Sequence, residues 1–237
     1  MSEPHLVNLA LQGGGAHGAY TWGVLDRLLD DGRVRIEGLS GTSAGAMNAV
    51  VLADGMRRGG PEGAREALHD FWRGVSDAAS VMSPVQRTPL DVFLGNWNLY
   101  HSPGYLWLDL LSRLASPSDI NPLNLNPLRD LVERLVDFDS ARHCERIKLF
   151  VSATNVRTGR IRVFERERID ADVVMASACL PLLFQAVEID GEHYWDGGYS
   201  GNPALFPFFY RCSSSDIVVV QINPIEIDYV PQSAREI

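Results

Sequence analysis

The first position whose setting suggests chemistry is a serine between small residues. The segment Gly41-Thr42-Ser43-Ala44-Gly45 has the form G-x-S-x-G and lies between an apolar run and a helical run. A strand-to-helix turn of this kind needs small residues around the serine and exposes its hydroxyl at a helix N-terminus, where negative charge is favoured. The string alone is weak evidence, but its context predicts Ser43 as a nucleophile, with Gly41 and Gly45 supporting the turn.

Three consecutive glycines form a second candidate, one strand and one helix before the serine. Gly13, Gly14 and Gly15, with Gly18, fit the dinucleotide-binding pattern G-x-G-x-x-G, and Glu37 lies near the position where an acidic residue would hold a ribose. The same loop could instead turn its backbone N–H groups toward the oxyanion of an acyl-transfer intermediate. The G-x-S-x-G segment that follows favours the oxyanion hole.

A serine nucleophile needs a base, and an aspartate is the best candidate. None of the six histidines follows Asp196, which disfavours the chain order serine, acid, histidine of the α/β-hydrolases. Asp196 ends an expected strand and is followed by Gly197 and Gly198, so that its carboxylate could meet the Ser43 hydroxyl directly. The pattern predicts a Ser43–Asp196 dyad, whereas His193, at an alternating strand position, is expected to be structural.

These three motifs, in this order, resemble the patatin-like phospholipases, lipid acyl hydrolases with a Ser–Asp dyad on a three-layer α/β/α fold. The residues that carry the resemblance are 13–18, 41–45 and 196–198, and it extends over about residues 6–223. It implies an oxyanion hole built from the amides of Gly13, Gly14 and Gly15, with no metal and no other cofactor. This family often has Arg or Lys where this chain has His17, and we expect His17 to contact the loop or the start of the helix.

The elements that must position these residues alternate between strands and helices. Apolar runs at 6–12 and 34–40 predict strands, and helical spacing at 18–30 and 44–58 predicts the helices that follow them. Further strands are expected at 147–155, 160–165, 186–195 (a hairpin that turns at Asp190-Gly191) and 216–223. The order predicts an α/β fold, a three-layer α/β/α sandwich with a mainly parallel central sheet.

One stretch fits no regular unit of this fold. The chain has 237 residues, 46% of them hydrophobic, which predicts a single domain over 1–237 with a cap or insert at about 76–126. Aromatic residues gather at 91–108, where Pro and Gly break the pattern, and this segment is either a lid or lipid-contacting surface or ordinary core. The candidate lipid contacts are Trp97, Tyr100, Tyr105 and Trp107.

Composition limits the partners and the compartment. A formal charge of -9 without long like-charge runs argues against nucleic-acid binding. The N-terminal segment has no basic region before its short apolar run, and no apolar stretch is long enough to span a bilayer, so we expect neither a signal peptide nor a membrane anchor. Three widely spaced cysteines are typical of reduced thiols in a cytoplasmic protein. The oligomeric state stays open.

The functional hypothesis is a serine acyl hydrolase that cleaves lipid carboxylic esters, as a phospholipase A, a lysophospholipase or an esterase. Its partner would be a lipid or ester substrate, with transient contact to a lipid interface. Two alternatives keep the scaffold: a catalytically silent lipid- or protein-binding module, and a hydrolase of intracellular polyesters or thioesters. An NAD-dependent oxidoreductase remains an alternative only if the glycine loop binds a dinucleotide.

Overall fold

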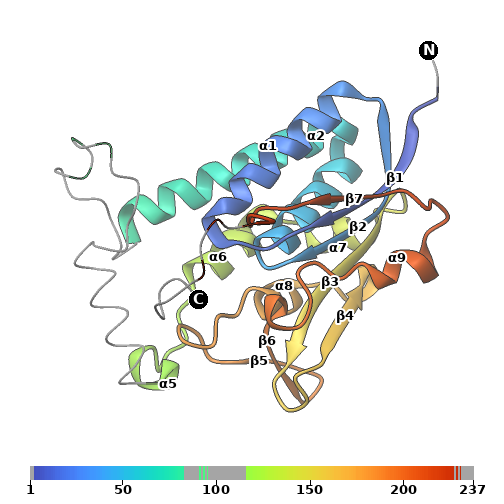
Figure 1. The fold of residues 1–237 in the computed structure, drawn as a ribbon. Coiled ribbons are helices and arrows are strands. Elements are labelled where there is room, and N and C mark those ends of the chain that lie inside the picture. Colours follow the sequence, from blue (N-terminus) through green and yellow to red (C-terminus); the bar gives the residue numbers. More distant parts are fainter. Residues whose placement is uncertain are drawn as a thin grey trace.

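A computed structural model describes residues 3–82 and 116–226, together with the single positions 91, 93, 95, 228 and 230 (Figure 1). The aromatic residues that are candidate lipid contacts lie in the part of the chain between these ranges. Trp97, Tyr100, Tyr105 and Trp107 therefore lie outside the described residues, and the lid remains a prediction.

A mixed, mostly parallel sheet forms the centre of the fold (Figure 1). Its seven strands within the described residues are β1 (His5–Leu11), β2 (Val34–Thr42), β3 (Lys148–Asn155), β4 (Ile161–Glu165), β5 (Val187–Ile189), β6 (Glu192–Asp196) and β7 (Ile217–Val220). They lie in the order β5-β6-β3-β2-β1-β7, with β4 also paired to β3. The strands β3, β2, β1 and β7 are parallel, whereas β4, β5 and β6 run antiparallel to their neighbours.

The antiparallel hairpin brings its last residue to the end of the parallel strands. β2 pairs with β3 as far as Thr42 and Ser152, and β6 pairs with the next residue, Ala153, through Asp196. The hairpin turn has Asp190 and Gly191 at φ values of 53° and 79°, the left-handed pair that a two-residue turn requires. The end of β6 therefore reaches the residues that follow β2.

Helices cover both faces of the sheet. α1 (Gly18–Asp31), α2 (Ala44–Met82), α6 (Pro127–Leu135), α7 (Phe138–Arg142) and α8 (Ala171–Ser177) share one large core with Leu9 and Leu11 of β1. The residue between these leucines, Ala10, points to the other face and packs there with Phe208 of α9 (Phe206–Arg211). The three-layer α/β/α prediction is confirmed. None of the described helices is long and apolar enough to cross a membrane.

α2 is a helical hairpin rather than one straight helix. Its backbone is non-helical at Gly59 and Gly60, Pro61 follows, and the chain then folds back beside its own first half. A Cβ atom on Gly63 would lie 2.7 Å from the carbonyl oxygen of Gly55, which shows how closely the two halves approach. Helical spacing in the sequence predicted only the first half, 44–58. Residues 76–82, expected to begin the insert, instead continue α2, and α5 (Pro117–Ile120) lies near the insert's other end.

Candidate active site

Ser43 occupies the turn between β2 and α2 in a conformation that side chains rarely adopt. Its φ of 54° lies in the left-handed region, which costs a residue other than glycine about 1–2 kcal/mol. Its backbone N–H donates to the Ser177 hydroxyl at 2.9 Å, and that hydroxyl donates to the Ser152 carbonyl at 2.7 Å. The end of α8 thus holds the turn against β3, and such strain is commonly maintained at functional sites.

Glycines allow this turn to lie directly against the neighbouring backbone. A Cβ atom on Gly13 would lie 2.7 Å from the Ser43 Cβ, one on Gly41 would strike the Gly45 carbonyl, and one on Gly45 would strike the Leu11 carbonyl. The Cβ on Gly13 would also lie 2.7 Å from the Thr42 carbonyl oxygen, so all three positions meet backbone that cannot move aside. These contacts explain why Gly13, Gly41 and Gly45 need to be residues without side chains.

The substitution Gly45→Ala should prevent the turn from forming, because its methyl group would overlap the Leu11 carbonyl of the central strand β1. We expect little folded protein, or a loss of several kcal/mol in stability. Gly23→Ala is the matched control, since this α1 position has open space around it and alanine should add about 0.5–1 kcal/mol there. Thermal unfolding of both variants tests the contrast; equal melting temperatures would contradict it.

Asp196 lies beside Ser43 in a buried position. Its side chain is 5% exposed, and the Gly198 N–H donates to its Oδ1 at 2.7 Å. Burial raises the pKa of this carboxyl above its usual value, and the Gly198 amide and the nearby Ser43 hydroxyl oppose the rise. Ser43 and Asp196, far apart in the chain, line the same cavity, in a setting where a carboxylate has increased affinity for a proton. Their action as a dyad stays a prediction.

Asn202 joins the loop after Asp196 to the glycine loop. The Gly13 N–H donates to the Asn202 Oδ1 at 2.6 Å, and the Asn202 Nδ2 lies 3.4 Å from the Gly13 carbonyl oxygen. Two hydroxyl groups of β2 also bind the loop after Asp196: Ser40 donates to the Ala204 carbonyl, and Thr42 donates to the Gly201 carbonyl. None of the three sequence motifs contains Asn202. A carboxamide six residues after Asp196, next to a proline, is the signal that pointed there.

An apolar cavity of about 650 Å³ opens over these residues. Its polar lining includes Ser43, Asp196 and Asn202, next to Gly13, Gly14 and Gly15. The rest is mainly apolar: Met47, Phe71, Trp72, Val75, Leu128, Ala178, Leu180 and Phe184. A mainly apolar cavity with a few convergent polar groups is typical of a small-molecule site.

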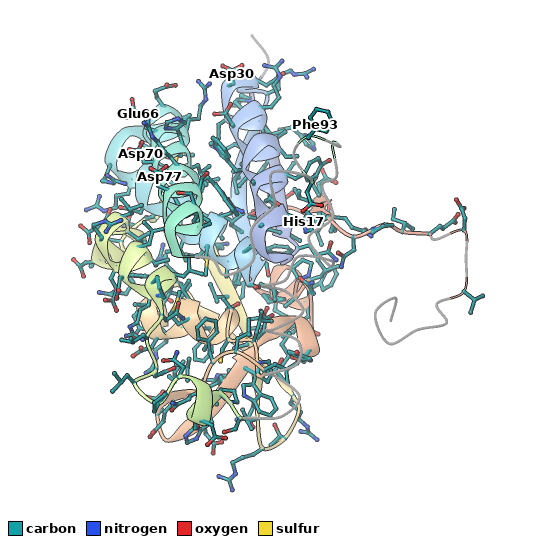
Figure 2. All side chains as sticks on the ribbon, turned by 90° about the vertical axis from the view of Figure 1, so that its left-hand side faces the viewer. His17, Asp30, Glu66, Asp70, Asp77 and Phe93 are labelled. Carbon is teal, nitrogen blue, oxygen red and sulfur yellow. The ribbon has the colours of Figure 1, made fainter. Side chains whose placement is uncertain are left out.

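The glycine loop leaves two backbone donors unused within the described residues. The Gly13 amide is bound by Asn202, whereas the Gly14 and Gly15 amides have no hydrogen-bond partner in this part of the chain. His17, labelled in Figure 2 at the opposite end of α1 from Asp30, is exposed and contacts the Gly14 carbonyl at 3.2 Å through Nδ1. Its ring is not part of the cavity lining.

A buried pair behind the cavity wall was not found by sequence reasoning. Trp72 donates from its indole N–H to Asn48 at 2.9 Å, and Asn48 donates to the carbonyls of Gly18 and Ala44. Asn48 therefore ties the starts of α1 and α2 to the second half of α2. Neither residue belongs to a recognisable motif. Only the second half of α2, which was not predicted, places Trp72 at the site.

Two other residues from the sequence analysis lie away from the cavity. The Glu37 carboxylate is bound by Lys148 at 2.9 Å and by the Ser213 and Ser214 amides, at the opposite end of the sheet from the glycine loop. It therefore does not occupy the ribose-binding position that a dinucleotide site would require. His193 is exposed and lies 3.9 Å from Glu188. Among the described residues, no group of three or more His, Cys, Asp or Glu side chains could hold a metal ion.

Fold and site together define an α/β protein in which a strand-to-helix serine, a buried aspartate and a glycine-rich loop share one apolar cavity. The family model described as patatin-like phospholipase matches residues 9–209. The chain therefore belongs to the patatin-like phospholipase family.

Two solved structures resemble this chain. VipD from Legionella pneumophila is 20% identical, with a TM-score of 0.48, over 92% of this chain and 49% of that one. The heterodimeric complex ExoU-SpcU, from the type III secretion system of Pseudomonas aeruginosa, contains a chain that is 21% identical, with a TM-score of 0.33, over 75% of this chain and 36% of that one. This chain thus spans half or less of each. A search of curated proteins gave no match.

Proposed function

We propose that this protein is a serine acyl hydrolase that cleaves lipid carboxylic esters through a Ser43–Asp196 dyad. The observation that carries the proposal is that Ser43, in its strained turn, and the buried Asp196 carboxylate line the same polar end of an apolar cavity. Membership of the patatin-like phospholipase family supports a lipid substrate. The cavity offers apolar surface to an acyl chain. A serine that only capped the N-terminus of a helix would not need such a cavity.

In the proposed reaction, Asp196 accepts the proton of the Ser43 hydroxyl as Oγ attacks the ester carbonyl. The Gly14 and Gly15 amides donate to the oxyanion that develops, and the N-terminus of α2 adds a favourable field. Collapse of the intermediate breaks the ester bond, and the leaving alcohol takes the proton from Asp196. Water then repeats the sequence: Asp196 takes its proton, the hydroxide oxygen attacks the acyl carbonyl, and the Ser43 oxygen leaves and recovers the proton.

A substrate panel tests the proposal. Phospholipids, lysophospholipids, and simple esters and thioesters of graded acyl length should be hydrolysed by wild type and not by Ser43→Ala, with turnover rising as the acyl chain fills the apolar cavity. Preferred cleavage of a thioester would support the alternative that the protein is a thioester hydrolase. A folded wild type that binds lipid but cleaves none of these substrates would support the binding-module alternative.

Asn202→Ala should slow catalysis by about tenfold or more, because it releases Gly13 and lets the neighbouring oxyanion donors lose alignment; a misplaced donor can cost several kcal/mol. Asn121→Ala is the matched control. Asn121 makes the same pair of hydrogen bonds with the Leu125 N–H and carbonyl, outside the cavity. We expect kcat to fall in Asn202→Ala alone, at similar melting temperatures. Equal kcat in both variants would remove Asn202 from the positioning of the loop.

A further inference from the structure

A second groove crosses the amino ends of β1, β2 and β3, at the opposite end of these strands from Ser43. Its volume is about 710 Å³, similar to that of the cavity at Ser43. One part of its wall is apolar and comes from β1, β2, α1, α2 and the residue before β3: Leu6, Leu29, Val34, Ile36, Met56 and Ile147. The proposed reaction uses none of these residues.

Two cations line the same groove without an anionic partner. Arg35 and Arg146 are exposed, and within the described residues their guanidinium groups make no ion pair or hydrogen bond. Arg57 lies beside Arg146 in an adjoining depression and is likewise unpaired in this part of the chain. Other arginines do find carboxylates, as Arg58 does with Asp54. In a chain with a net charge of -9, neighbouring unpaired arginines form a local positive site that favours an anion.

The carboxylates at this groove do not cancel that charge. Glu37 is bound by the Lys148 ammonium and by Ser213 and Ser214; burial alone would raise its pKa, but these hydrogen bonds outweigh burial and lower the pKa to about 2. Its negative charge is therefore permanent and already matched by Lys148. Glu145 is exposed and offsets only one of the two arginines that line the groove.

We propose that this groove binds a single-chain anionic amphiphile, and specifically a long-chain fatty carboxylate. Its alkyl chain would lie on the apolar wall, and its carboxylate would lie between Arg35 and Arg146, whose planar guanidinium groups match a carboxylate in two-point hydrogen bonding. The combination of an apolar wall with unpaired guanidinium groups stands independently of the reaction at Ser43. The choice of a fatty carboxylate rests on the proposed function, because hydrolysis of a lipid ester releases that anion.

Binding is measured with cis-parinarate, a fluorescent fatty acid, below its micelle concentration, on Ser43→Ala and on wild type whose Ser43 carries a fluorophosphonate. A saturable site should remain in both, and it should be the single site in the labelled protein, whose cavity at Ser43 is blocked. Saturated fatty acids should displace the probe with an affinity that rises by up to about fourfold for each added methylene, which corresponds to ~0.8 kcal/mol. Alcohols of equal length should bind at least tenfold more weakly, because they lack the charge.

The paired substitution Arg35→Gln with Arg146→Gln should weaken fatty acid binding at least tenfold and remove the preference over the alcohol. Its matched control, Arg134→Gln with Arg160→Gln, makes the same change in net charge at exposed arginines that are also unpaired within the described residues. An equal loss in both pairs, an affinity independent of chain length, or a site that disappears when Ser43 is blocked would overturn the proposal. If the fluorophosphonate does not label Ser43, that result would contradict only the proposal that Ser43 is the nucleophile. The fatty acid proposal would still be tested, because the comparison of the two arginine pairs in Ser43→Ala needs no label.

Discussion

A fluorophosphonate should add one label to the wild-type protein, at Ser43, and none to Ser43→Ala or Ser43→Gly. The reason is that, in the described part of the chain, only the Ser43 hydroxyl lies in a cavity that is also lined by a buried carboxylate and by unused backbone donors. Intact-mass spectrometry of the three proteins checks this expectation, followed by peptide mapping of the label. A label that persists in both variants would move the nucleophile to another residue.

The two Ser43 variants should differ in stability although both are inactive. At a φ of 54°, alanine has the same unfavourable backbone conformation as serine, whereas glycine adopts it freely. Relief of about 1–2 kcal/mol exceeds the extra chain entropy that glycine loses on folding, about 0.5–1 kcal/mol, so Ser43→Gly should be up to about 1 kcal/mol more stable than Ser43→Ala. Denaturant unfolding measures the difference. The reverse order would show that the turn is not strained.

Asp196→Asn should lower kcat by about two orders of magnitude or more, because the amide keeps the shape of the side chain but cannot accept the Ser43 proton. Asp54→Asn is the matched control: Asp54 is also buried, at 1% exposed, but is paired with Arg58 outside the cavity. We expect Asp54→Asn to keep its kcat and to lose about 1–3 kcal/mol of stability through weaker charged hydrogen bonds. Wild-type turnover in a folded Asp196→Asn protein would eliminate the dyad.

The raised pKa of Asp196 gives this prediction two pH signatures. Only the ionised carboxylate can act as a base, so wild-type activity should fall as the pH drops through a value above the usual range of a carboxyl group. The stability of the folded protein changes with pH in the opposite direction. The protonated Asp196 carboxyl fits the buried site better, so the stability that it contributes is lost as the pH rises through the folded-state pKa. Asp196→Asn should therefore be at least as stable as wild type at neutral pH, and this advantage should shrink in acid.

The elements near the three motifs could be predicted because their signals are local. Buried parallel strands are apolar throughout, and Gly32 ends α1 with a φ of 68°, so β1, α1 and β2 lie close to their predicted bounds. The Asp190-Gly191 turn was predicted for the same reason. The second half of α2 was missed because the Gly59-Gly60-Pro61 interruption resembles the end of a helix.

The supporting contacts of the site could not be predicted, because they depend on residues distant in sequence. Ser177 is an ordinary helix residue until α8 packs against β3 and brings its hydroxyl to the Ser43 amide. The sequence likewise offered Gly13, Gly14 and Gly15 as equal oxyanion donors. Only the contact with Asn202 distinguishes Gly13, whose amide is already used.

The Gly13–Asn202 contact also has a consequence for the time at which activity can arise during synthesis. Its partners are 189 positions apart, and β1 also pairs with β7, the last strand of the described chain. A ribosome adds about 5–20 residues each second, so the turn that carries Ser43 is synthesised many seconds before the segment that carries Asp196 and Asn202. Under the proposed mechanism, a nascent or prematurely terminated chain that ends before Asp196 would carry the nucleophile without its base. The proposed hydrolysis would then be confined to chains whose synthesis has passed Asn202.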